Sequence, residues 1–278
     1  MSRAIQNIDP KQAEELMSGM RPDEYTLLDV RQPWEYEVFH IPGALLAPLP
    51  ELADHLDEFE QDEPVIVYCR SGGRSMAAAK ILAGNGYTQV HNLMGGASAW
   101  LGQAAYGPVD LGLIDFTGSE TPGEAVAKAF DMEHNLQLSY LRWAEEQDGE
   151  DATNLFVELA GFEELHKDVL YRMYAKVEDA PLDRATFEAR VLGTAGGMTE
   201  GGVEIETFLE EHGELFEGLE GIVMLSMMIE SQAYDYYMRC SRASLNSETR
   251  EAFGLLAREE QAHLRLLGRR MDAFGDEA

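Results

Sequence analysis

The chain of 278 residues has only two cysteines and no long apolar run. Cys69 and Cys240 are too few for a disulfide scaffold or a four-cysteine zinc site. No stretch of about 18 apolar residues occurs, so we expect no membrane-spanning helix and no membrane partner. The N-terminus has no apolar segment of signal-peptide type, which predicts a cytoplasmic protein.

Basic residues are also scarce. Lys and Arg number 21 against 51 Asp and Glu, and the formal net charge is -30. Because such a charge repels phosphate, we expect no nucleic-acid partner. Residues 64–105 are an exception, since they contain no Asp or Glu and carry Arg70, Arg74 and Lys80. This local excess of positive charge predicts that a small anion binds there.

The first hundred residues alternate between strand and helix patterns. Short apolar runs at 25–30, 64–68 and 90–93 are typical of buried strands. The Ala-rich segment 75–86 has helical spacing, and Asp9 before a proline is a helix-start signal. Strands that alternate with helices predict an α/β domain with a parallel sheet flanked by helices.

From about residue 120 the segments become long and rich in Glu, Ala, Leu and Met. Thr121, Pro122 and Glu124 form the capping pattern of a helix start. We therefore expect an all-α second half. The predicted division is an α/β domain at 1–105, a linker at 106–119, and a helical domain at 120–278 whose long crossover spans about 178–217.

The helical half contains an internal repeat at an offset of 97 residues. Each copy has a glutamate and, thirty positions later, the motif Glu-x-x-His. The matching pairs are Glu133 with Glu230, Tyr140 with Tyr237, Glu163 with Glu260, and His166 with His263. One helix pair that occurs twice predicts four long helices. Residues at i and i+3 share a helix face, so each motif directs a carboxylate and an imidazole to one point.

Four carboxylates and two histidines in this order are the ligand set of dinuclear iron or manganese sites in four-helix bundles. The carboxylates offset the charge of two divalent ions, which permits burial of these otherwise costly groups. Tyr140 and Tyr237 either hydrogen-bond the ligand carboxylates or pack in the core. The alternative is a duplicated bundle that has lost its metal. The predicted metal ligands are Glu133, Glu163, His166, Glu230, Glu260 and His263.

Residues 120–275 resemble the rubrerythrin branch of the ferritin-like superfamily. The matching segments are Glu133 with Tyr140, residues 159–166, Glu230 with Tyr237, and residues 256–263. The resemblance implies a ferritin-like four-helix bundle with the six ligands above. It implies two metal ions, iron or alternatively manganese or a mixed pair, that react with peroxide or dioxygen. It also implies a homodimer. The chain has no Cys-x-x-Cys motif, so electrons must come from an external donor.

Cys69 stands in a glycine-rich loop that follows an apolar strand and precedes a helix start. Successive backbone N–H groups, the helix N-terminus and two arginines all favour a thiolate there. The alternatives are a buried, inert cysteine and a solvated charge at Arg70. The predicted catalytic residue is Cys69, and the predicted substrate-binding residues are Arg70, Ser71, Gly72, Gly73, Arg74 and Ser75.

The spacing Cys-x4-Arg is one residue shorter than the Cys-x5-Arg loop of related phosphatases, which disfavours a phosphatase. Residues 4–103 resemble single-domain rhodaneses. The resemblance implies a sulfurtransferase in which Cys69 takes sulfur from a small anionic donor and passes it to cyanide or a thiol. A sulfur carrier or redox sensor with a metal-binding or assembly bundle is the alternative. The matching residues are Asp29-Val30-Arg31, Glu35, His40–Ala44, the Cys69 loop, Gly95-Gly96 and Trp100.

Overall fold

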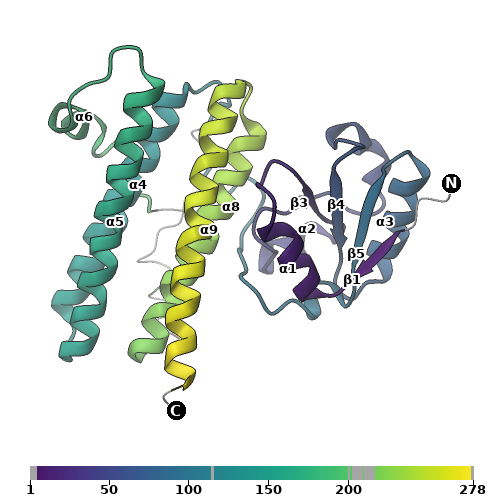
Figure 1. The fold of residues 1–278 in the computed structure, drawn as a ribbon, viewed down its shortest axis with the longest axis horizontal. Helices are drawn as coiled ribbons and strands as arrows, with labels where there is room; N and C mark the ends of the chain where they lie inside the picture. Colours follow the sequence, from purple (N-terminus) through teal and green to yellow (C-terminus); the bar gives the residue numbers. More distant parts are fainter. Residues whose placement is uncertain (1–4, 114–115, 200, 202–208, 210–216, 277–278) are drawn as a thin grey trace. The chain divides into compact units, whose positions relative to one another are not determined.

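A computed structural model describes residues 5–113, 116–199, 201, 209 and 217–276 (Figure 1). The chain divides into two compact units, Met1–Asp110 and Leu111–Ala278. Part of the predicted crossover, at 200, 202–208 and 210–216, lies outside the described residues. Of the helices formed by the described residues, none combines the length and the apolar character needed to cross a membrane.

The N-terminal unit is a five-stranded parallel sheet flanked by helices, as the sequence predicts. The strand order is β1-β5-β4-β2-β3. The strands are β1 (Gln6–Ile8), β2 (Thr26–Asp29), β3 (Leu45–Leu46), β4 (Pro64–Tyr68) and β5 (Gln89–Leu93). The helices are α1 (Pro10–Ser18), α2 (Pro33–Val38) and α3 (Gly73–Gly84), with 3-10 turns at Leu52–Asp54, Leu56–Glu58 and Gly96–Ser98.

Both faces of this sheet are covered, which explains why its strands are continuously apolar. Successive side chains of a strand point to opposite faces. Leu28, Val65 and Val67 therefore pack with residues of α3, whereas Leu27 and Ile66 pack with residues of α1 and α2. Parallel sheets with two covered faces have such apolar strands rather than alternating ones.

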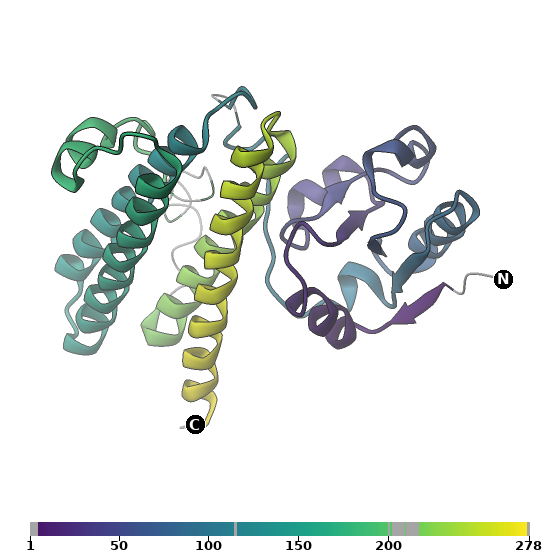
Figure 2. The same cartoon turned by 45° about the horizontal axis from the view of Figure 1, so that its top comes forward.

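The C-terminal unit consists mainly of four long helices that form two hairpins (Figure 2). Helix α4 packs chiefly on α5, and α8 packs chiefly on α9. The hairpins meet through α4 with α9 and through α5 with α8. Helix α4 begins with the predicted capping box at Thr121. The helices are α4 (Pro122–Glu146), α5 (Glu150–Val177), α6 (Arg184–Val191), α8 (Gly218–Ala243) and α9 (Ser247–Asp276).

Candidate functional site

Cys69 directly follows the last residue of β4, and α3 begins four positions later. The backbone N–H of Gly72 turns back and donates to the Cys69 sulfur at 3.1 Å. Gly72 has a φ of 101°, in the left-handed region that glycine adopts readily. Cys69 itself is only 1% exposed. The loop therefore holds the sulfur at its floor, with backbone donors around it.

The surroundings of the sulfur favour its charged form. Burial alone raises the pKa of the Cys69 thiol. Hydrogen bonds from the Ser75 hydroxyl and from the backbone N–H groups of Ser75, Ser71 and Gly72 lower it, and the pKa ends below its usual value. Hydrogen bonding thus outweighs desolvation, and a larger fraction of Cys69 is thiolate, the nucleophilic form, at neutral pH.

The two arginines of the loop are placed differently. Arg74 donates two hydrogen bonds to Glu35 of α2, at 2.6 and 2.7 Å. This bidentate pair lowers the pKa of Glu35 and raises that of Arg74. Arg70 is exposed, as is the neighbouring Ser71. Since Glu35 offsets the charge of Arg74, Arg70 supplies the exposed positive charge of the loop.

A second glycine-rich segment supports the loop from the side of β5. The N–H groups of Ala97 and Ser98 donate to the carbonyl oxygens of Cys69 and Arg70, at 2.8 and 2.9 Å. Gly96 approaches so closely that a Cβ there would stand 2.0 Å from the Cys69 carbonyl oxygen. The Cys69 loop therefore depends on backbone that lies far along the chain.

Asp29 and Arg31 brace the neighbouring strand end. Their side chains form an ion pair at 2.6 Å and are almost fully buried. Arg31 also donates to the carbonyl oxygen of Phe39, just after α2, at 2.7 Å. His40 stacks on Tyr36 with ring centroids 3.6 Å apart. These contacts join the end of β2 to α2, which is a structural role.

In the helical unit, the first copy of the repeat converges on one point. Glu133 comes from α4, and Glu163 and His166 come from α5. Nδ1 of His166 lies 3.0 Å from a Glu163 oxygen and 3.3 Å from a Glu133 oxygen. One potential ligand atom from each residue lies within 4.8 Å of the other two. This triad has the residue types and the proximity that a metal ion requires.

The second copy repeats this arrangement. Nδ1 of His263 lies 3.1 Å from a Glu260 oxygen of α9 and 3.3 Å from a Glu230 oxygen of α8. The rings of His166 and His263 stack with centroids 3.5 Å apart and planes 5° apart. The two triads are therefore neighbours, and the structure brings together all six residues that the sequence predicts as ligands.

The two triads lie between apolar layers. On α4, Phe130 belongs to one hydrophobic cluster and Leu136 to the other, and Glu133 comes between them. On α5, α8 and α9 a ligand glutamate likewise lies between residues of one cluster and residues of the other. The four glutamates are only 1–3% exposed. Carboxylates held in such surroundings need compensating positive charge.

The donor set fits two divalent cations. Four carboxylates carry four negative charges, and two imidazoles supply at most two positive ones. Burial raises the pKa of Glu230, but the two imidazoles and a hydrogen bond with Glu260 lower it to about 2. Two divalent ions would balance the four carboxylates with neutral, ligating histidines.

Tyr140 and Tyr237, the remaining repeated pair, are buried at equivalent places. Tyr140 packs against Trp143 and Phe156, with ring centroids 5.7 and 6.2 Å away. Tyr237 packs against Tyr236 and Phe253. Both tyrosines therefore contribute their rings to the core.

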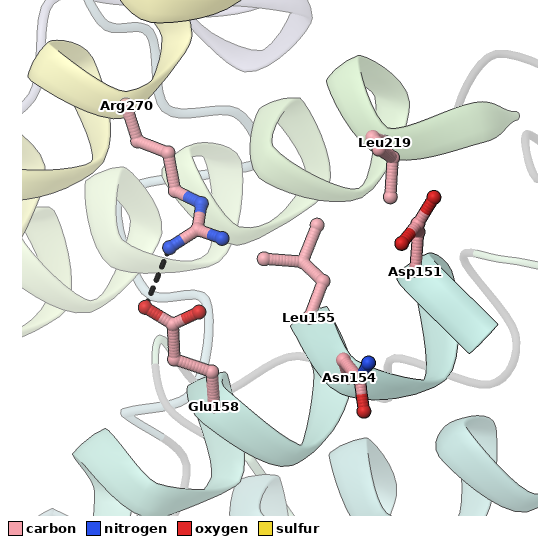
Figure 3. A pocket seen from close by; sticks show the side chains of 6 residues that line it. All are labelled: Asp151, Asn154, Leu155, Glu158, Leu219 and Arg270. Carbon is pink, nitrogen blue, oxygen red and sulfur yellow. Dashed lines mark hydrogen bonds and ion pairs between the residues drawn. The ribbon is translucent and has the colours of Figure 1, made fainter.

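A separate cavity of about 210 Å³ opens between α5, α8 and α9 (Figure 3). Arg270 of α9 bonds to Glu158 of α5 across it at 2.5 Å. None of the six predicted ligands lines this cavity. Its ion pair joins the two helix hairpins at the surface. The lining residues are Asp151, Asn154, Leu155, Glu158, Leu219 and Arg270.

Comparisons with known proteins identify the N-terminal unit. The family model of the rhodanese-like domain matches residues 10–103. The thiosulfate sulfurtransferase GlpE of Pseudomonas syringae is 35% identical over 96 residues, which cover 34% of this chain and 87% of that protein. The chain belongs to the rhodanese-like family. The family match includes the Cys69 loop and lies outside the four long helices.

Two other similar proteins cover 28% and 34% of the chain. A sulfurtransferase of Allochromatium vinosum is 40% identical over 78 residues, 28% of this chain and 73% of that protein. A crystal structure of a rhodanese-like domain protein from Staphylococcus aureus is 29% identical, with a TM-score of 0.32, and the match covers 34% of this chain and 91% of that one.

The sequence patterns do not predict two asparagines that are linked to the Cys69 loop. Ser75 donates to Asn92 of β5 at 2.7 Å, and Asn92 donates to Asn7 of β1 at 2.9 Å. Asn92 is 3% exposed, and asparagine is uncommon in buried strands. The sequence does contain one indication of this contact. Asn92 is a polar residue inside the predicted strand 90–93, and a buried polar side chain needs a hydrogen-bond partner.

Proposed function

We propose that this chain is a thiosulfate or persulfide sulfurtransferase in which Cys69 carries the transferred sulfur. The observation that supports it most is the position of the Cys69 sulfur at the floor of a loop whose N–H groups and Ser75 hydroxyl lower its pKa. The similarity to a protein named thiosulfate sulfurtransferase supports the same reaction class.

The reaction consists of two displacements at sulfur. The Cys69 thiolate attacks the outer sulfur of thiosulfate, a new S–S bond forms, and sulfite leaves with the electron pair of the old S–S bond. A nucleophilic acceptor, cyanide or a thiolate, then attacks the outer sulfur of the Cys69 persulfide. The Cys69 thiolate leaves with the electron pair and is regenerated. No further oxidant or reductant is required.

The loop residues have distinct roles in this scheme. The exposed Arg70 attracts the anionic donor, and the N–H groups of the loop stabilise the charged sulfur. Arg74, fixed by Glu35, holds the start of α3 in place. The loop of Cys-x4-Arg spacing suits a single sulfur atom on Cys69 better than a phosphate group.

Steady-state production of thiocyanate from thiosulfate and cyanide tests the proposal. We expect turnover in the wild type, none in Cys69→Ser, and unchanged turnover in Cys240→Ser, which removes the other thiol. A persulfide that forms on Cys69 but turns over negligibly would favour the carrier alternative. Hydrolysis of a phosphate ester that disappears in Cys69→Ser would favour a phosphatase.

For the helical half, we propose a ferritin-like four-helix bundle that holds two metal ions. The proposed division is a sulfurtransferase domain at 1–105, a linker at 106–119 and the bundle at 120–278. The convergence of two Glu, Glu-x-x-His triads supports this proposal. The ions are iron, with manganese or a mixed pair as the alternatives. When bound, such ions supply electron transfer to peroxide or dioxygen.

The protein's own groups prepare this site. The four glutamates and two histidines would hold the ions, and the apolar clusters on both sides limit the access of water. Tyr140 and Tyr237 fix the packing around the ligands. The chain has no Cys-x-x-Cys motif, so we propose an external electron donor, and we propose a homodimer that light scattering tests.

Metal analysis of anaerobically purified protein tests the second proposal. We expect two metal ions per chain and the optical spectrum of ferric carboxylate sites after oxidation. Glu133→Gln combined with Glu230→Gln removes one anionic ligand from each triad and should lower the metal content markedly. Gln137→Ala, a polar change one turn from Glu133, serves as control. Protein that retains its helicity but takes up no metal would contradict the proposal.

A further inference from the structure

A chain of hydrogen bonds runs from the sheet edge to Ser75, whose hydroxyl is one of the groups that lower the pKa of the Cys69 thiol. Asn7 lies on the edge strand β1 and pairs in register with Asn92 of β5. Asn92 donates to Asn7 at 2.9 Å and accepts from the Ser75 hydroxyl at 2.7 Å. Ser75 is fully buried and Asn92 is 3% exposed. Asn7 is exposed, so the chain begins at solvent and ends beside Cys69.

The Ser75 hydroxyl has two acceptors and only one proton. It donates to the Asn92 oxygen at 2.7 Å, and it is also one of the donors that lower the pKa of the Cys69 thiol. A hydroxyl donates one hydrogen bond. While the Ser75 proton points to Asn92, the Cys69 thiolate lacks a hydrogen bond from this hydroxyl. When the proton turns to the sulfur, the Asn92 group beside Ser75 must become a donor to the Ser75 oxygen.

The two amides can provide that donor without any movement of the backbone. Rotation of an asparagine amide by half a turn exchanges its oxygen and nitrogen at nearly the same positions. After rotation, Asn7 donates to Asn92, Asn92 donates to Ser75, and Ser75 donates to the sulfur. Ser75, Asn92 and Asn7 therefore have hydrogen-bond partners in either orientation of the chain, as buried polar groups require.

We propose that Asn92 and Asn7 are positioning residues that reverse this chain with the charge on the Cys69 sulfur. The inference rests on the proposed function, since sulfur transfer alternates that charge. In the thiolate, the chain points toward the sulfur and adds a donor to it. In the persulfide, the charge resides on the outer sulfur, Sγ becomes a weak acceptor, and the Ser75 proton returns to Asn92.

Two substitutions of Asn92 give opposite expectations for the pKa of Cys69. Asn92→Asp can only accept, so it holds the Ser75 proton away from the sulfur. We expect a pKa higher by about one pH unit, which means about tenfold slower alkylation below the pKa. Asn92→Leu offers no acceptor, so the hydroxyl has only the sulfur to bond. We expect a pKa equal to or below that of the wild type.

The measurement is the pH dependence of iodoacetamide alkylation at Cys69 in the full chain, read on its peptide by mass spectrometry. The buried Cys240, whose pKa is raised to about 12, contributes little to this readout. The charged groups near the loop, Arg70, Arg74 with Glu35, and Asp29, are unchanged in every variant. Alkylation does not require sulfur transfer, so this test is independent of the turnover assay.

A double-mutant cycle separates the hydroxyl from simple charge. In a Ser75→Ala background, Asn92→Asp should raise the pKa much less than in the wild type, because no proton remains to be redirected. An equal increase in both backgrounds would overturn the proposal. A shift of the same sign for Asn92→Asp and Asn92→Leu would also overturn it.

The exposed end of the chain gives a test that does not disturb the core. Asn7→Asp can only accept from Asn92, which fixes the Asn92 oxygen toward Ser75. We expect a smaller increase in the pKa of Cys69. Gln6→Glu adds the same charge to the same strand at an exposed position outside the chain of hydrogen bonds, and it should leave the pKa unchanged. Equal shifts for the two variants would contradict a directional chain.

Discussion

Cys69 is held in place by backbone that only glycine permits. Gly72 turns its N–H toward the sulfur at a φ of 101°, and Gly96 lies against the Cys69 carbonyl group with a φ of 56°. A side chain at either position requires a strained conformation. At the scale of single residues, the position of the Cys69 sulfur therefore depends on the backbone of two glycines as well as on its own side chain.

Gly96→Ala should destabilise the rhodanese-like domain severely. The added Cβ would stand 2.0 Å from the Cys69 carbonyl oxygen, and a loss of about 2–4 kcal/mol is expected from strain and overpacking together. Gly84→Ala, in open space at the end of α3, should change stability by about 1 kcal/mol or less. Denaturant unfolding measures both, and equal effects would contradict this account of the loop.

Glu35→Gln should lower stability only when Glu35 is ionised in the wild type. The Arg74 pair holds the pKa of Glu35 below its ordinary value of 4.5. The contribution is therefore complete above about pH 4.5 and is lost as the pH falls through the lowered pKa. Because the pair is partly exposed, we expect about 1 kcal/mol or less at pH 7.

Calorimetry of both proteins at several pH values checks this dependence. The difference in Tm between wild type and Glu35→Gln should be largest at neutral pH and should close in acid. A difference that stays constant down to about pH 3 would show that packing, rather than charge, accounts for the effect.

At the scale of helices and strands, the sequence predicts the long and periodic segments well. The predicted strands 25–30, 64–68 and 90–93 contain most or all of β2, β4 and β5, and the predicted helix 75–86 is α3 at Gly73–Gly84. The capping box at Thr121 is confirmed. These segments are long enough for composition and local signals to determine their structure.

The missed elements are short or depend on distant partners. Strand β1 has three residues and β3 has two, which is too short for a periodicity to appear. They form because β5 and β2 offer open edges for pairing. For the same reason, the contact between Asn7 and Asn92 could not be predicted, since 85 positions separate the two residues.

Thr121→Ala tests the capping box of α4. Thr121 accepts from the Glu124 N–H, and Glu124 accepts in return from the Thr121 N–H. Loss of the cap should cost about 1 kcal/mol. Thr121→Ser keeps the hydroxyl and should restore most of the stability. Thermal unfolding followed by circular dichroism measures both, and equal losses would show that the methyl group is the important part.

At the scale of the whole molecule, one chain joins a reactive thiol to a cluster of buried carboxylates and histidines. Thiolates with a lowered pKa are vulnerable to oxidation by peroxide. If the helical half consumes peroxide, it protects Cys69. This connection is motivated by the covalent linkage of the two units and requires no particular arrangement of them.

Removal of metal should therefore shorten the lifetime of Cys69 under peroxide. We expect sulfinic and sulfonic acid at Cys69 to accumulate faster in protein with Glu133→Gln and Glu230→Gln than in metal-loaded wild type, at equal peroxide and with an external reductant. Mass spectrometry of the Cys69 peptide measures the products. Equal rates of oxidation would show that the two halves act independently.

In the proposed reaction, Cys69 carries the transferred sulfur. Intact-protein mass spectrometry after incubation with thiosulfate tests it most directly. We expect that the wild type and Cys240→Ser gain the mass of one sulfur atom, that cyanide removes it, and that Cys69→Ser gains nothing. A wild-type protein that gains no sulfur, or a Cys69→Ser variant that still does, would show that Cys69 is not the sulfur carrier.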